Sequence, residues 1–106
     1  MKVYGAPICI DCVKSKNILD KLKADYKYID ITESTSNMRE FLSLRDSRQE
    51  FDIIKKKGRI GIPAFVFTDG RIEFDIDDIK EEEIQADYKN ELEIDDMPGL
   101  CGLDGC

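Results

Sequence analysis

Hydrophobic and polar positions follow one another along the chain in blocks that predict strands and helices in turn. Residues 2–4 include the β-prone Val3 and Tyr4 and predict a first strand, which the Gly-Ala-Pro turn at 5–7 ends. Helical spacing begins directly afterwards and predicts an amphipathic helix that starts at or just after Cys9. The face of this helix that is expected to be buried contains Ser15, Ile18, Leu19 and Leu22.

The middle of the chain predicts one more strand and two more helices. Aromatic and β-branched residues at 26–31 predict a strand, parallel to the first because a right-handed crossover connects them. Helical spacing over 38–45 predicts a second helix, and residues 48–57 predict a shorter one that Gly58 stops. The core residues expected from these two helices are Met38, Phe41, Phe51 and Ile54.

A hairpin and a last helix are expected next. Pro63 should open an apolar strand at 64–67, because proline cannot donate a hydrogen bond within a sheet. The Asp69-Gly70 turn signal joins this strand to an antiparallel one at 72–74, and a final helix is expected from Asp77 to about residue 88. The pattern predicts an α/β fold with a four-stranded mixed sheet flanked by helices.

Length and charge restrict the class of protein. A chain of 106 residues predicts one domain, expected at 1–89 and monomeric, followed by a tail at 90–106. The net charge of −7 argues against a nucleic-acid or anionic-membrane partner. No long apolar run or signal-peptide pattern is present, so a cytoplasmic location is expected. In that compartment, cysteines more often serve catalysis, redox sensing or metal binding than a disulfide framework.

Cys9 and Cys12 are the candidate catalytic residues. The start of a helix offers unpaired backbone N–H groups and a positive dipole end, which favour a thiolate at Cys9. Only a thiolate attacks a disulfide, so Cys9 is the expected nucleophile. Cys12 follows about one turn later, close enough to resolve the mixed disulfide. Asp11 adds a negative charge beside the thiolate and works against it.

Other interpretations of this cysteine pair stay open. Two cysteines at this spacing also suit half of a zinc site, a structural disulfide or two small core residues. The strand, turn and helix around the pair favour redox chemistry.

Two further cysteines lie in the acidic tail. Cys101 and Cys106 are a possible second redox pair that exchanges electrons with Cys9 and Cys12. Alternatively, all four thiolates ligate zinc or an iron-sulfur cluster, which would make the protein a binding or sensing module. A third possibility is that the tail cysteines do nothing essential. A return of the tail to the first pair is feasible, because loop-closure cost rises only slowly with length.

Positive charges cluster at Lys55–Lys57 and Arg59. This cluster could attract an acidic partner or the carboxylates of a peptide thiol such as glutathione. Alternatively, it is a solvated helix end, where cations suit the dipole.

Five segments taken together match one known family: Val3-Tyr4, Pro7 to Lys14, Tyr28 to Ile31, Gly61-Ile62-Pro63 and Asp69-Gly70. Over residues 1–88 the chain resembles a glutaredoxin of the thioredoxin-fold superfamily. The resemblance implies a thiol-disulfide oxidoreductase whose partners are a disulfide-containing protein or a small thiol substrate. It implies glutathione or another thiol reductant as co-substrate, a possible reductase partner and no tightly bound cofactor.

The resemblance also implies a substrate site. A cis bond between Ile62 and Pro63 would place their loop beside Cys9, and the backbone of Ile62 would pair with an extended substrate. Asp77 or Asp78 would hold the amine of the substrate. The substrate-binding residues implied are Pro7, Ile62, Pro63, Asp77 and Asp78.

Two departures from the family pattern concern glutathione. Ala6 stands where many glutathione-using members carry a lysine, and Phe74-Asp75 begins the stretch where they carry a Gly-Gly pair. A lost cation and a narrower groove should weaken the binding of an anionic tripeptide. The scaffold therefore resembles the family more closely than the glutathione site does.

Overall fold

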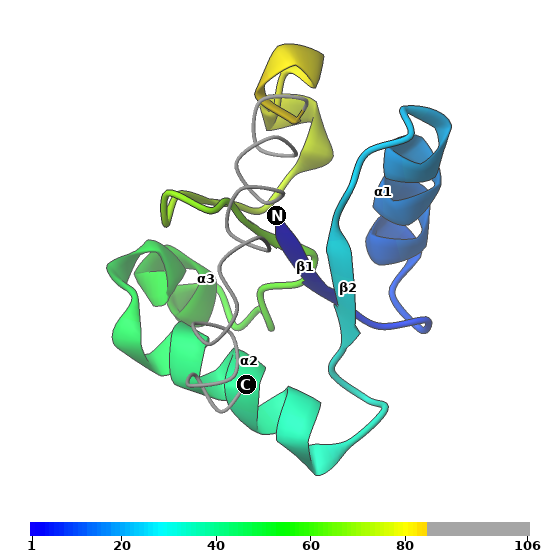
Figure 1. Ribbon diagram of the computed structural model, residues 1–106. Coiled ribbons are helices and arrows are strands. Elements are labelled where there is room, and N and C mark those ends of the chain that lie inside the picture. Colours follow the sequence, from blue (N-terminus) through cyan, green and yellow to red (C-terminus); the bar gives the residue numbers. More distant parts are fainter. Residues whose placement is uncertain (85–106) are drawn as a thin grey trace, which may run out of the picture.

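Four short strands form one mixed sheet in the computed structural model, which describes residues 1–84 (Figure 1). Across the sheet the order is β2 (Lys27–Asp30), β1 (Lys2–Gly5), β3 (Ala64–Val66) and β4 (Ile72–Glu73). Strand β1 is parallel to β2 and antiparallel to β3, and β3 and β4 form an antiparallel hairpin. The α/β fold with a four-stranded mixed sheet is confirmed.

Three complete α-helices accompany the sheet within residues 1–84: α1 (Ile10–Lys21), α2 (Thr35–Ser47) and α3 (Asp52–Lys56). The predicted helix at 48–57 divides into a 3-10 turn at Gln49–Phe51 and α3. Gly58 ends α3 with a φ of +69°, a backbone conformation that glycine adopts without strain. No helix in the described part of the chain is long and apolar enough to cross a membrane.

The sheet is buried on both faces. Val3 and Tyr4 are successive residues of β1 and therefore point to opposite faces. In Figure 1, α1 lies on one side of the central strands, and α2 with α3 lies on the other. Tyr4 joins one cluster, with Ala6, Ile29, Ile31, Phe41, Phe51, Ala64 and Ile72. Val3 joins the other, with Met1, Leu19, Phe65, Phe67, Ile79 and Ile84.

The buried face of α1 differs from the predicted one at Ile18. The stripe that packs inward is Cys12, Ser15 and Leu19, whereas the side chain of Ile18 is 39% exposed. Burial of Cys12 shifts the stripe, so that Ile18 falls at its edge and lines a groove. The prediction of Ile18 as a core residue is wrong.

The final helix does not start at Asp77. Residues Ile76–Asp78 form a 3-10 turn, capped by the Asp75 carboxylate, which accepts the backbone N–H of Asp77 at 3.0 Å. The next helical turn occupies residues 81–84. Its entry is fixed by the Glu83 carboxylate, which accepts the backbone N–H of Lys80 at 3.2 Å. The cap expected at Asp77 is therefore wrong, and the predicted course to residue 88 and the domain boundary at 89 lie outside the described residues.

Candidate active site

Cys9 occupies the N-cap position of α1. Its sulfur accepts the backbone N–H of Cys12 at 3.2 Å, and its own N–H donates to the carbonyl of Ala6 at 3.1 Å. The Cys9 side chain is partly exposed. The sulfur that substrate can reach therefore faces the positive end of the helix, where backbone N–H groups stabilise negative charge. The predicted helix start is confirmed.

Cys12 lies one turn further on and is fully buried, with no exposed side-chain surface. Burial, first of all, and then the hydrogen bond with the Cys9 sulfur and the nearby Asp11 charge together raise the pKa of the Cys12 thiol to about 12. A reagent from solution therefore meets Cys9 first. The two thiols therefore differ in access, and the roles of nucleophile and resolving thiol stay predictions.

Because Cys12 is buried, we expect the free energy of unfolding to depend on pH. The unfolded thiol loses its proton near its ordinary pKa of 9.0, whereas the folded thiol keeps it to about 12. The free energy of unfolding should therefore be unaffected below pH 9 and decrease as the pH rises from 9 towards 12. Urea unfolding of the reduced protein, measured against Cys12→Ala, isolates this contribution. A difference between the two that is constant across this pH range would contradict it.

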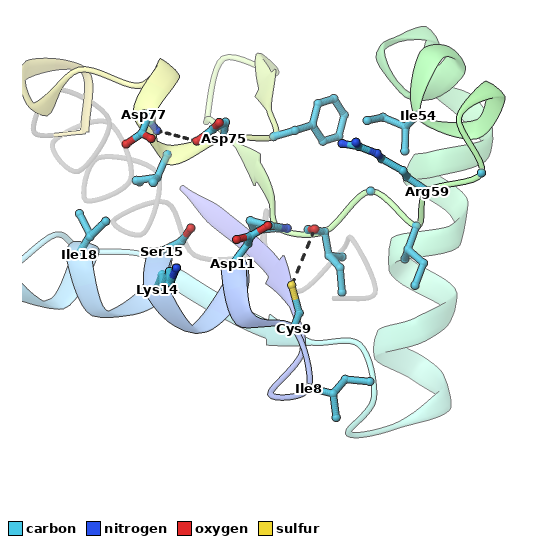
Figure 2. Close-up of a pocket in the computed structure, with 17 residues that line it drawn as sticks. Ile8, Cys9, Asp11, Lys14, Ser15, Ile18, Ile54, Arg59, Asp75 and Asp77 are labelled. Atoms are coloured by element: carbon cyan, nitrogen blue, oxygen red, sulfur yellow. Dashed lines mark hydrogen bonds between the residues drawn. The ribbon is translucent and has the colours of Figure 1, made fainter.

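The loop before β3 lies beside Cys9. The Ile62–Pro63 bond is cis, and the carbonyl oxygen of Ile62 lies 4.0 Å from the Cys9 sulfur (Figure 2). Both features agree with what the family resemblance implies. The loop therefore offers a backbone edge next to the nucleophile.

Arg45 of α2 holds this loop in place. Its guanidinium donates to the backbone carbonyls of Arg59 and Ile60, each at 2.9 Å. Arg45 lies in the predicted helical stretch at 38–45, but its hydrogen-bond partners are backbone carbonyls 14 and 15 residues away. Backbone acceptors leave no trace in a sequence pattern, so this positioning role is seen only in the structure.

A groove of about 990 Å³ runs past Cys9 between the start of α1, the 58–63 loop and residues 74–77. Arg59 and the acidic side chains of Asp75 and Asp77 enter it from different segments (Figure 2). Lys14 and Asp11 line it from α1. The groove thus presents both cations and carboxylates around a nucleophilic sulfur, an arrangement that suits a zwitterionic peptide.

Not all the predicted substrate-binding residues line this groove. Ile62, Pro63 and Asp77 do. Pro7 and Asp78 are exposed residues outside its lining. Of the two candidate amine ligands, Asp77 is therefore the one that faces the groove.

The structure shows where Ala6 and Phe74, the two departures from the family pattern, lie relative to the groove. Ala6 is almost fully buried and presents no charge to the groove. The ring of Phe74 lines the groove and packs edge-on against Phe51, with the ring centroids 4.9 Å apart. Phe74 therefore packs on a buried core residue and forms part of the groove wall.

The metal-binding alternative depends on residues beyond the described part. Within residues 1–84, no group of three or more cysteine, aspartate or glutamate side chains is arranged to hold a metal ion. Cys101 and Cys106, which would complete a four-cysteine site with Cys9 and Cys12, lie outside the described residues. The four-cysteine site and the second redox pair therefore stay predictions.

The sheet order and a cysteine at a helix N-cap beside a cis-proline loop define a thioredoxin-fold protein. A family model described as Glutaredoxin matches residues 1–72, and the chain belongs to that family. The chain is also 36% identical over 78 residues to a Haemophilus influenzae protein named only as uncharacterized. That alignment covers 74% of this chain and 91% of the relative. No solved structure gives a significant match. Membership places the chain among thiol-disulfide oxidoreductase-like proteins.

Proposed function

We propose that this protein is an enzyme that reduces disulfides by a dithiol mechanism, with Cys9 as nucleophile and Cys12 as resolving thiol. The observation that carries the proposal is the contrast between the two sulfurs. The Cys9 sulfur is partly exposed at the N-cap of α1, whereas the Cys12 sulfur is buried one turn behind it.

The chemistry follows in two exchanges. The Cys9 thiolate attacks one sulfur of a substrate disulfide and forms a mixed disulfide, while the other half leaves as a thiolate and takes up a proton. Cys12 then gives up its proton and attacks the Cys9 sulfur, which releases the second substrate thiol. The backbone edge at Ile62 would hold the substrate extended during both steps. Two electrons pass to the substrate, and a Cys9–Cys12 disulfide is left.

A thiol reductant must then restore the pair, and glutathione is one candidate. Arg59 and Lys14 could receive its carboxylates, and Asp77 its ammonium group. Ala6 supplies no cation, and Phe74 narrows the groove, so we expect weaker use of glutathione than of a protein dithiol reductant. We propose that the protein acts as a cytoplasmic monomer on disulfide-containing proteins or small disulfides.

A redox titration of the metal-free chain tests this function. Thiols are trapped by alkylation at each potential and counted by intact mass, and peptide mapping assigns them. We expect reversible two-electron oxidation of Cys9 and Cys12 in the family range, about −200 to −270 mV. If this pair never oxidises reversibly, the enzyme proposal fails. One equivalent of metal bound to the freshly reduced chain would then favour the four-cysteine site.

A further inference from the structure

A second pocket lies beside the active-site groove. It has a volume of about 410 Å³ and is formed between α2 and the loops before α1, after β2 and before β3. Ile8, Ile60 and Ile62 line both this pocket and the groove. Ile62 is also the residue whose carbonyl oxygen lies 4.0 Å from the Cys9 sulfur. The pocket, which we call the apolar pocket, is therefore continuous with the groove next to the nucleophile.

The apolar pocket differs from the groove in its chemistry. The groove presents cations and carboxylates, whereas most of the described residues that line the pocket are apolar, among them Met38 and Leu42 of α2. Arg45 is the charged residue among them, and its guanidinium already donates to the backbone carbonyls of Arg59 and Ile60. An apolar side chain gains free energy by leaving water in such a place, whereas a charged group does not.

The walls of the apolar pocket rest on the core. Ala6, Ile31 and Phe41 line it, and all three are buried members of the core cluster that also contains Tyr4. Met38 packs against the same cluster. The pocket is therefore formed before a ligand arrives, and filling it requires little ordering of the protein.

The chemistry of the pocket favours one kind of occupant. Ala6, one of the two departures from the family pattern, lines the pocket and offers no cation to a carboxylate. Glutathione carries two carboxylates and an ammonium group, and no bulky apolar side chain. A peptide with an aliphatic side chain beside its cysteine has the group that this pocket can bury, and the shared lining at Ile62 places that group next to the reacting sulfur.

We propose that the apolar pocket selects the substrate by binding an aliphatic side chain of about leucine size, within two residues of the cysteine that reacts with Cys9. The substrate class is peptide or protein disulfides with such a residue beside the cysteine, in preference to glutathione disulfide. An extended peptide advances about 3.3 Å per residue, so this side chain starts within about 7 Å of the reacting cysteine along the chain. The proposal rests on the proposed function, because it needs Cys9 as nucleophile.

The first exchange, followed in a single turnover, tests the proposal. The chain with Cys12→Ser, Cys101→Ser and Cys106→Ser keeps Cys9 as its one thiol. The Cys9 thiolate attacks one sulfur of a symmetric peptide disulfide, and the new bond forms as the peptide S–S bond breaks. The other peptide leaves as a thiolate and takes up a proton. Intact mass at successive times gives the rate at which the mixed disulfide forms.

Three substrates are compared: the disulfides of the end-blocked tripeptides Leu-Cys-Leu and Ser-Cys-Ser, and glutathione disulfide. Each rate is divided by the rate of the same disulfide with a small free thiol, which removes differences in intrinsic reactivity. Below saturation, we expect the leucine peptide to react at least about tenfold faster than the serine peptide, because burying a leucine favours binding by about that factor or more. Glutathione disulfide should also react more slowly than the leucine peptide.

A matched pair of variants assigns the preference to the apolar pocket. Leu42 lines the pocket but not the groove and is 41% exposed, whereas Ile53 is 58% exposed and lines neither. Leu42→Glu and Ile53→Glu each replace an aliphatic side chain by one negative charge. We expect Leu42→Glu to lower the ratio of the leucine rate to the serine rate below about threefold, and Ile53→Glu to keep it. Leu42→Gln, which adds no charge, should lower the ratio as well, and circular dichroism checks that each variant is folded.

Several outcomes would overturn the proposal. One is equal rates for the leucine and serine peptides, and another is a Leu42→Glu variant that slows both peptides in the same proportion. A dimer that Leu42→Glu dissociates, seen by sedimentation equilibrium, would assign the pocket to a second copy of the chain. Equal peptide rates with a reversible Cys9–Cys12 pair in the redox titration would remove the substrate preference and leave the proposed function. No mixed disulfide with any of the three substrates would overturn both.

Discussion

Replacement of Cys9 by serine is expected to lower disulfide reduction by at least about a thousandfold, because a hydroxyl cannot form the mixed disulfide. Cys12→Ser should instead leave the first exchange intact and accumulate a mixed disulfide on Cys9, because the resolving thiol is lost. Turnover of a small disulfide and intact mass after reaction measure the two effects. Both effects follow from the partial exposure of the Cys9 sulfur and the burial of the Cys12 sulfur.

The comparison is best made in a background without the tail thiols. With Cys101→Ser and Cys106→Ser in place, no other cysteine can resolve a mixed disulfide on Cys9 or replace it as nucleophile. Circular dichroism and urea unfolding check that each variant is folded. A mixed disulfide trapped in Cys9→Ser, with Cys12→Ser inactive, would reverse the assignment of the two roles.

Gly61→Ala is expected to lower the free energy of unfolding by about 2 to 4 kcal/mol, more than the same change at Gly58. Gly61 has a φ of +102°, where residues with a side chain are strained. A Cβ there would lie 2.9 Å from the ring of Phe51, which is fully buried and has no space to move. The loop that carries Ile62 and Pro63 would shift, so activity should fall as well.

Gly58→Ala serves as the matched control. Gly58 also has a positive φ, +69°, but a Cβ there would meet no atom within 4 Å. It should therefore cost only the backbone strain, about 1 kcal/mol, with activity retained. Urea denaturation measures both variants. Equal losses of stability would show that contact with Phe51 contributes nothing to the effect.

The order of strands and helices was predictable because local signals agree with the fold. The turn at Gly5 to Pro7, the Asp69-Gly70 hairpin and the helical spacing of α2 each specify structure over a few residues. The two catalytic candidates were predictable for the same reason. Cys9 and Cys12 lie on one helical turn, so their relation depends on local geometry alone.

Features that depend on contacts between residues far apart in the sequence were harder to predict from the sequence. Ile18 follows the helical period, yet the buried stripe of α1 is Cys12, Ser15 and Leu19, and tertiary contacts decide which face of a helix is buried. Pro7 and Asp78 are neighbours in sequence of residues that line the groove, but they are not part of its lining. A pocket of about 410 Å³ beside the groove joins residues of α2 to Ile60 and Ile62, and no local pattern connects these segments.

The N-cap hydrogen bond of α1 also has a consequence for redox poise. The Cys9 sulfur accepts the Cys12 N–H in the reduced protein, and a thiolate is a stronger acceptor than a disulfide sulfur. Reduction therefore improves a helix cap, an interaction worth about 1 kcal/mol. For a two-electron couple, about 1 kcal/mol corresponds to roughly 20 mV. By stabilising its own reduced form, this helix makes the Cys9–Cys12 pair a slightly stronger oxidant than the same dithiol would be elsewhere in the fold.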